Sequence, residues 1–195
     1  MIKIAIILGS TRPGRRGRAV AEWVASVAAK QSGDVKYEVV DLADFDLPVL
    51  DEEHPALFGT YGKEHTARWA ETIAGYDGFV FVTAEYNHSV PGALKNALDY
   101  LFAEWNNKAA GFVSYGLHGG TRAVEHLRLI LAELKVATVR SQVVLSLFSD
   151  FQYSAPTETG TFTPGPRQES TLVLTLNEVE AWSQALKPLR DPALV

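Results

Sequence analysis

Four arginines fall within seven residues near the start of the chain: Arg12, Arg15, Arg16 and Arg18. They closely follow the apolar run of residues 4–8, where a strand should end and a helix begin. A helix N-terminus carries about half a positive charge, so it would repel these arginines unless an anion lay between them. Guanidinium groups and unpaired backbone N–H groups together suit a phosphate. The segment therefore predicts a phosphate-binding loop, with a solvated basic loop as the alternative.

The glycines of this loop argue against the usual nucleotide motifs. Gly9 and Gly14 have the spacing of a P-loop, but Arg15 and Arg16 stand where that motif needs lysine and Ser/Thr. No Gly-x-Gly-x-x-Gly occurs in the chain, which removes the usual dinucleotide fingerprint. What remains is a hydroxyl pair, Ser10 and Thr11, beside Arg12. One terminal phosphate, as in a mononucleotide, fits this set best.

A second segment, residues 83–101, joins an apolar run to a helical pattern. Tyr86 offers a flat ring with a polar tip, and Asn87 offers amide donors and acceptors. Pro91 suits the first turn of the following helix. This loop could border a flat heterocycle; an ordinary strand-to-helix turn is the alternative.

A third segment, residues 114–122, contains three glycines within five residues, Gly116, Gly119 and Gly120. Glycine lets the backbone pass close to a ligand, and the N–H groups could face the electron-rich edge of a ring. A tight turn is the alternative explanation. His118 is a candidate acid or base, although a loop histidine is more often merely exposed.

Length and composition predict a single domain over residues 1–195, because 47% hydrophobic residues can bury one sizeable core. The chain has no cysteine, so redox chemistry would need a bound cofactor. A net charge of −5 and a pI near 5.5 argue against nucleic-acid binding. No stretch approaches the roughly 18 to 20 apolar residues of a membrane span. The first eight residues are too short an apolar run for a signal peptide. We expect a cytoplasmic enzyme.

The elements that must position these loops alternate along the chain. Strands are expected at residues 2–8, 36–41, 78–83, 109–115 and 138–145. Helical spacing of apolar residues appears around residues 20–28, 94–101, 127–134 and 168–187. The alternation predicts an α/β protein with a doubly wound parallel sheet covered on both faces. Two long connections, residues 42–62 and 146–167, suggest functional excursions.

Together, the motif Leu8-Gly9-Ser10-Thr11-Arg12, residues 85–101 and residues 114–120 resemble the NAD(P)H-dependent FMN reductases of flavodoxin-like fold. The resemblance covers residues 2 to about 145. It implies five parallel strands in the order 2-1-3-4-5, with the ligand beyond the carboxyl ends of strands one and three.

The resemblance also implies a set of FMN-binding residues. The phosphate side comprises Gly9, Ser10, Arg12, Arg15, Gly17 and Arg18, the ring side comprises Glu85, Tyr86, Asn87 and His88, and the pyrimidine side comprises Ser114, Gly116, His118 and Gly119. Residues 46–51 look like the family's partner-facing segment beside the flavin. Two positions depart from the pattern: Ala84 replaces a common proline, and Gly17 replaces a common serine.

The expected reaction transfers hydride from NADPH or NADH through FMN to a small acceptor such as free flavin, a quinone or an azo compound. No catalytic side chain is required, because the hydride chemistry belongs to the flavin. The histidines show no zinc spacing, and no metal is expected: His54, His65, His88, His118 and His126. A flavodoxin-like electron carrier without steady-state NAD(P)H turnover is the alternative.

A homodimer is expected, with pairing into a homotetramer as a further form. Phe102 and Trp105 follow the helix of residues 94–101, whose inner face already serves the sheet. Large aromatic side chains are enriched in interface cores, so a two-fold partner would cover these two. The alternative is that the chain's own connection of residues 42–62 covers them.

Overall fold

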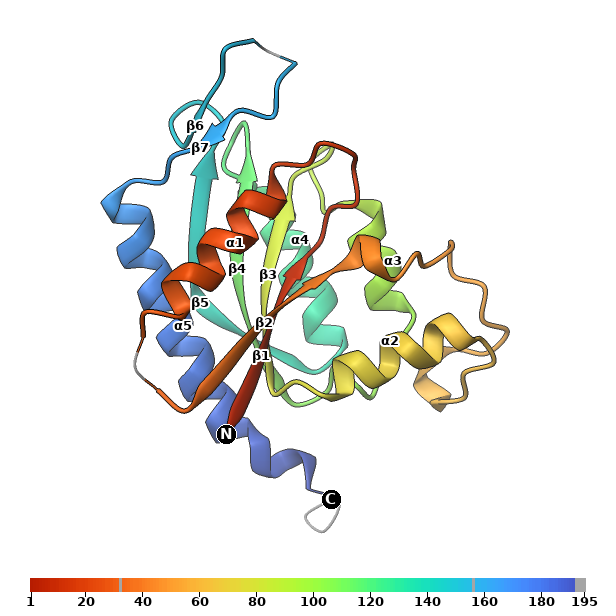
Figure 1. The fold of residues 1–195 in the computed structure, drawn as a ribbon. Helices are drawn as coiled ribbons and strands as arrows, with labels where there is room; N and C mark the ends of the chain where they lie inside the picture. Colours follow the sequence, from red (N-terminus) through yellow and green to blue (C-terminus); the bar gives the residue numbers. More distant parts are fainter. Residues whose placement is uncertain (32, 156, 192–195) are drawn as a thin grey trace.

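The computed structural model describes residues 1–31, 33–155 and 157–191. Its central sheet has the order β2-β1-β3-β4-β5, and all neighbouring pairs are parallel (Figure 1). The strands are β1 (Ile2–Leu8), β2 (Val35–Asp41), β3 (Gly78–Ala84), β4 (Lys108–Gly116) and β5 (Val136–Ser146). The expected doubly wound α/β fold and strand order are confirmed.

Helices cover both faces of the sheet (Figure 1). α1 (Gly17–Ala28) and α5 (Pro166–Leu186) pack on one face, and α2 (Glu64–Ala74), α3 (Gly92–Asp99) and α4 (Thr121–Glu133) pack on the other. Because both faces are covered, the central strand β3 is buried along its whole length. Among the described residues, no helix is long and apolar enough to cross a membrane.

Helix α2 was not among the helices expected from the sequence. Its buried stripe consists of Thr66, Trp69, Ala70 and Ile73, at the i, i+3, i+4, i+7 spacing of an amphipathic helix. The stripe starts with a polar residue and spans only two turns, so its apolar signal is weak. The structure thus adds one helix to the side of the sheet that carries α3 and α4.

Residues 146–167 form an excursion, as expected, and contain a hairpin that was not predicted. β6 (Phe151–Gln152) pairs antiparallel with β7 (Thr161–Phe162), and Figure 1 places this hairpin at the carboxyl end of the sheet. The Phe151 side chain is buried, with its ring 5.1 Å from that of Phe162 and 6.4 Å from that of Tyr115. These contacts fix the base of the hairpin on the body of the domain.

The surroundings of Trp105 correct the argument made for a partner subunit. Trp105 is only 1% exposed in the single chain, and its Nε1 donates to the carbonyl of Leu98 at 3.3 Å. Its ring lies 5.9 Å from that of Trp69 on α2 and 5.0 Å from that of Phe79 on β3. Phe102 packs partly buried against the same core. Trp105 therefore needs no partner, and its ring contacts come from α2 and β3 rather than from the connection of residues 42–62.

Candidate functional site

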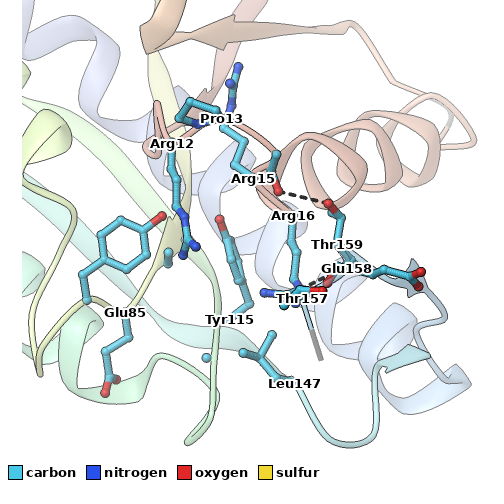
Figure 2. Close-up of a pocket in the computed structure, with 14 residues that line it drawn as sticks. Arg12, Pro13, Arg15, Arg16, Glu85, Tyr115, Leu147, Thr157, Glu158 and Thr159 are labelled. Atoms are coloured by element: carbon cyan, nitrogen blue, oxygen red, sulfur yellow. Dashed lines mark hydrogen bonds between the residues drawn. The ribbon is translucent and has the colours of Figure 1, made fainter. Parts of the chain in front are cut away.

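A cavity of about 570 Å³ opens at the carboxyl ends of the strands. Its walls come from the loop after β1, the ends of β3 and β4, and the hairpin segment 157–159 (Figure 2). The volume lies within the range of small-molecule sites. In open α/β sheets this is the edge at which ligands bind. The cavity is thus the candidate site.

Arg12 supplies an uncompensated positive charge to this cavity. Figure 2 shows its side chain extending from the loop toward the Tyr115 ring. Its backbone N–H donates to Ser10 Oγ at 3.4 Å, but its guanidinium has no acceptor among the described residues. A guanidinium without a protein partner suits a phosphate or carboxylate of a ligand.

Arg15 and Arg18 share one acidic partner within the chain. Both contact the carboxylate of Asp41 at the end of β2, Arg15 through Nη2 and Arg18 through Nη2 at 3.3 Å. The Asp41 side chain is only 3% exposed, and its Oδ1 also accepts the N–H of Ala43 at 3.0 Å. An external anion therefore need not offset all four arginines. The buried Asp41 carboxylate pairs with two of them and cancels one of their two positive charges.

Arg16 binds the hairpin instead of projecting as a free cation. Its Nε donates to the carbonyl of Thr159 at 2.7 Å and its Nη2 to that of Glu158 at 2.9 Å. The guanidinium also lies over the Tyr153 ring, 4.9 Å from its centroid. In return, Thr159 Oγ1 donates to the carbonyl of Gly14 at 3.2 Å (Figure 2). These contacts hold the hairpin against the arginine loop.

The two glycines of the predicted phosphate side are required by packing. A Cβ on Gly9 would lie 2.9 Å from Leu94 Cδ2. A Cβ on Gly17, the first residue of α1, would lie 2.6 Å from Leu8 Cδ1 and 2.8 Å from Tyr115 Oη. Gly17 thus lets α1 approach β1 and β4 closely, which accounts for glycine where serine is common.

Two tyrosines form one side of the cavity. Tyr86 Oη lies 2.8 Å from Oγ of the buried Ser10, so this hydroxyl pair joins the loops after β1 and β3. The Tyr115 hydroxyl is buried and has no partner at hydrogen-bonding geometry within the described chain. Burial, together with nearby Tyr86, raises the pKa of Tyr115 well above its usual value. Tyr115 is therefore a neutral hydroxyl without a protein partner.

Glu85 presents its backbone, not its charge, to the cavity. Its carboxylate points away from Arg12 in Figure 2 and accepts from Arg122 Nε at 2.6 Å and from the Arg122 backbone N–H at 3.2 Å. Burial alone would raise the pKa of Glu85, but the hydrogen bond and charge of Arg122 outweigh it and lower the pKa. The carboxylate thus ties the end of β3 to the N-terminus of α4.

Asn87 and His88 form a tight turn outside the cavity wall. Their φ angles are 48° and 75°, and the N–H groups and carbonyls of Tyr86 and Ser89 exchange hydrogen bonds of 2.9 and 3.1 Å. Asparagine and histidine adopt left-handed backbone more readily than most residues other than glycine, and both side chains are exposed. The structure places them at the rim, beside Tyr86.

Hydrogen bonds among its own residues hold the loop after β4 in shape. Ser114 Oγ is buried and donates to the carbonyl of Gly119 at 2.7 Å, while the Gly119 N–H donates to that of Gly116 at 3.0 Å. Gly119 has a φ of 71°, and a Cβ there would lie 2.1 Å from Val144 Cγ1. Gly116 lines the cavity, whereas exposed His118 does not.

Five of the predicted residues line the cavity together: Arg12, Arg15, Glu85, Tyr86 and Gly116. Gly9, Ser10, Gly17, Ser114 and Gly119 support them from behind, whereas Arg18, Asn87, His88 and His118 lie outside the wall. The site residues predicted from the sequence did not include Tyr115, Leu147 or residues 157–159, which also line the cavity. Tyr115 could have been selected from its place beside Gly116. Nothing in the sequence placed the hairpin there.

The profile of the NADPH-dependent FMN reductase family matches residues 2–150. The chain belongs to this family. It is 44% identical over 149 residues to an NAD(P)H-dependent FMN reductase of a Nectria species, covering 72% of this chain and 74% of the relative. It is 36% identical over 141 residues to a quinone reductase of Escherichia coli, covering 68% and 71%.

Solved structures agree on the fold. The flavoenzyme NAD(P)H:(acceptor) oxidoreductase FerB of Paracoccus denitrificans matches with a TM-score of 0.64 at 21% identity, covering 96% of this chain and 98% of that one. Oxidised flavodoxin 1 of Bacillus cereus matches with a TM-score of 0.53 at 18% identity, covering 91% and 97%. At these identities the likeness establishes only the flavodoxin-like fold.

Family membership makes the protein an oxidoreductase with FMN as cofactor and NAD(P)H as co-substrate. The cavity residues fit FMN. The Arg12 guanidinium suits its phosphate, and the Tyr86 and Tyr115 rings offer a wall for its flat ring. Gly116 has no side chain to fill the cavity, where a Cβ would lie 3.3 Å from Glu85 Cβ.

Proposed function

We propose that FMN binds in the 570 Å³ cavity with its phosphate at Arg12 and its ring beside Tyr86 and Gly116. There it serves the transfer of hydride from NADPH or NADH to a small electron acceptor. The observation that carries this proposal is the Arg12 guanidinium, which enters the cavity uncompensated while Arg15 and Arg18 pair with Asp41. It is the charge best placed for a ligand phosphate.

The protein contributes position and electrostatics to this reaction. Hydride chemistry is supplied by FMN when it is bound, through the flavin N5. Tyr86 and Tyr115 line the cavity, and the Ser10–Tyr86 contact and the Glu85–Arg122 pair hold the β1 and β3 loops in place. No side chain has to act as a nucleophile or base.

A quinone or free flavin is the proposed acceptor, with azo compounds as a further class. Relatives named quinone reductase and 2-hydroxy-1,4-benzoquinone reductase are 36% and 32% identical to this chain, which supports a quinone. The acceptor would gain the equivalent of one hydride and one proton, and NAD(P)H would leave as NAD(P)⁺. A cytoplasmic location stays a prediction from composition.

An anaerobic spectroscopic titration tests the proposed function. The purified protein is loaded with FMN, freed of excess flavin and mixed with NADPH or NADH without oxygen. We expect the absorbance of bound oxidised flavin to bleach, and to return when a benzoquinone is added. Flavin that stays oxidised for minutes with both donors would favour a binding protein or electron carrier instead.

We propose a homodimer on a different basis from Trp105. The connection of residues 42–62 exposes four large apolar side chains: Val49 at 87%, Phe58 at 69%, Leu57 at 64% and Leu50 at 45%. Several exposed large apolar side chains on one connection are typical of a surface that a partner covers. Light scattering should give a multiple of 21.3 kDa, either dimer or tetramer, with a smaller mass for Phe58→Glu. A wild-type mass near 21.3 kDa with full FMN content would contradict this proposal.

A further inference from the structure

A second hollow, which we call the hairpin groove, adjoins the candidate site. It has a volume of about 540 Å³ and is lined by Arg16, Leu117, Leu147, Phe148, Tyr153 and Ala155. Arg16 and Leu147 also line the 570 Å³ cavity, so the two hollows share part of one wall. We propose that the hairpin groove binds the adenosine half of NAD(P)H. This inference rests on the proposed function, because it assigns a place to that function's co-substrate.

Phe148 is the main apolar surface of the groove, and the turn that presents it is well ordered by hydrogen bonds. Its side chain is 78% exposed. The Phe148 N–H donates to Ser146 Oγ at 3.1 Å, the Asp150 N–H donates to the Ser146 carbonyl at 3.0 Å, and the Ser146 N–H donates to Asp150 Oδ2 at 2.8 Å. Leu117, Leu147 and Tyr153 line the same hollow as Phe148, and such a grouping of apolar side chains at the surface is typical of a binding site.

Tyr153 and Arg16, which also line the groove, are held in place by contacts. The Tyr153 ring is stacked on the Phe151 ring at an interplanar angle of 14°. The Arg16 guanidinium lies 4.9 Å from the centroid of the Tyr153 ring. Arg16 donates to the hairpin through Nε and Nη2, which leaves Nη1 without a partner in the described chain. The groove thus combines an aromatic, apolar lining with a cation at its junction with the FMN cavity.

This combination matches the dinucleotide better than the electron acceptor. A quinone or flavin acceptor has to reach only the ring in the main cavity. NAD(P)H is longer, since a pyrophosphate and an adenosine follow its nicotinamide half. With the nicotinamide in the main cavity, the pyrophosphate would pass near Arg16, and the adenine could stack on Phe148. Aromatic side chains bind bases by such stacking, and guanidinium groups bind phosphates.

The hairpin that completes the groove lies outside the part of the chain that matches the family profile, which ends at residue 150. Tyr153 and Ala155 belong to this segment, while Leu117 and Phe148 belong to the matched part. The groove is therefore formed by the hairpin together with two loops of the part that matches the profile.

The test compares two hydride donors on the FMN-loaded protein. NADH carries adenosine, and reduced nicotinamide mononucleotide lacks it. In Phe148→Ala we expect the ratio of KM for NADH to KM for the mononucleotide to rise about tenfold, the effect of losing one stacked base. Leu129→Ala is the matched control, because Leu129 is 74% exposed on α4 and lines neither hollow, and this ratio should stay as in the wild type.

Binding of ADP-ribose, measured by calorimetry, gives a readout that is independent of turnover. We expect the FMN-loaded wild type and Leu129→Ala to bind it, and Phe148→Ala to bind about tenfold more weakly at unchanged FMN content. Equal KM ratios and equal ADP-ribose affinities in the three proteins would overturn the assignment while leaving the proposed function intact. ADP-ribose binding that depends on Phe148, without any NADH oxidation, would uphold the groove and contradict the proposed function.

Discussion

Replacing Arg12 by alanine should weaken FMN binding selectively. Arg12 provides the guanidinium in the cavity that has no partner among the described residues. A charge-assisted hydrogen bond contributes about 1.5 to 3 kcal/mol, and solvent at this open loop favours the lower end. Arg12→Ala should therefore raise the FMN dissociation constant by roughly 10- to 30-fold. Riboflavin, which lacks the phosphate, should bind the variant and the wild type equally. Quenching of flavin fluorescence measures both affinities.

Arg18→Ala is the matched control for this measurement. Arg18 belongs to the same loop and is 53% exposed, but it lies outside the cavity wall and pairs with Asp41 at 3.3 Å. Its removal should leave FMN affinity close to that of the wild type, because Arg15 still pairs with Asp41. The assignment of the FMN phosphate to Arg12 would be wrong if Arg12→Ala weakened the binding of FMN and riboflavin equally. It would also be wrong if Arg18→Ala weakened FMN binding as much as Arg12→Ala does.

Three further predictions concern stability. Glu85→Gln should lower the free energy of unfolding by about 1 to 3 kcal/mol near neutral pH in urea titrations, and the difference should vanish in acid. Its lowered pKa means that the stability from this carboxylate is present above the usual 4.5 and is lost as pH falls through the folded value. Gly17→Ala should destabilise the fold by about 1 to 3 kcal/mol through its 2.6 Å approach to Leu8, seen as a lower Tm; an unchanged Tm would contradict the packing argument. Burial, with help from Arg190, lowers the pKa of Lys108 from 10.5 to about 7. Because the unfolded chain then holds the extra proton, wild-type stability should rise from about pH 7 to pH 9, and Lys108→Met should lack that rise.

Most of the fold could be predicted, because the sequence patterns that mark its strands are local. Apolar runs of β-branched and aromatic residues mark the buried strands, and the observed bounds of β1, residues 2–8, agree with those expected. Helix α2 shows the limit. Its stripe depends on Thr66, which is buried only because α2 packs on the sheet, and a polar residue gives no apolar signal. The β6–β7 pairing spans only two residues in each strand, too few for a period to appear.

The position of the candidate site could be predicted from the sequence, but not which of its arginines lacks a partner. Loops after parallel strands must meet at one edge, so the cavity's position followed from the fold. Which arginine remains without a partner depends on contacts between distant residues. Asp41 lies 26 positions from Arg15, and Thr159 lies 143 positions from Arg16. Neither pairing leaves a trace in local sequence, because both arise only when the sheet and the hairpin are assembled.

The location of the phosphate in a crystal structure of the FMN complex tests the central claim most directly. We predict that it lies within about 3 Å of the Arg12 guanidinium, with the ring beside Tyr86 and Gly116. A second cavity of about 320 Å³ is lined by Thr11 of the β1 loop and by Asp46, among others. Its carboxylate would repel a phosphate. FMN bound there, or a phosphate that makes no contact with Arg12, would contradict the proposed site.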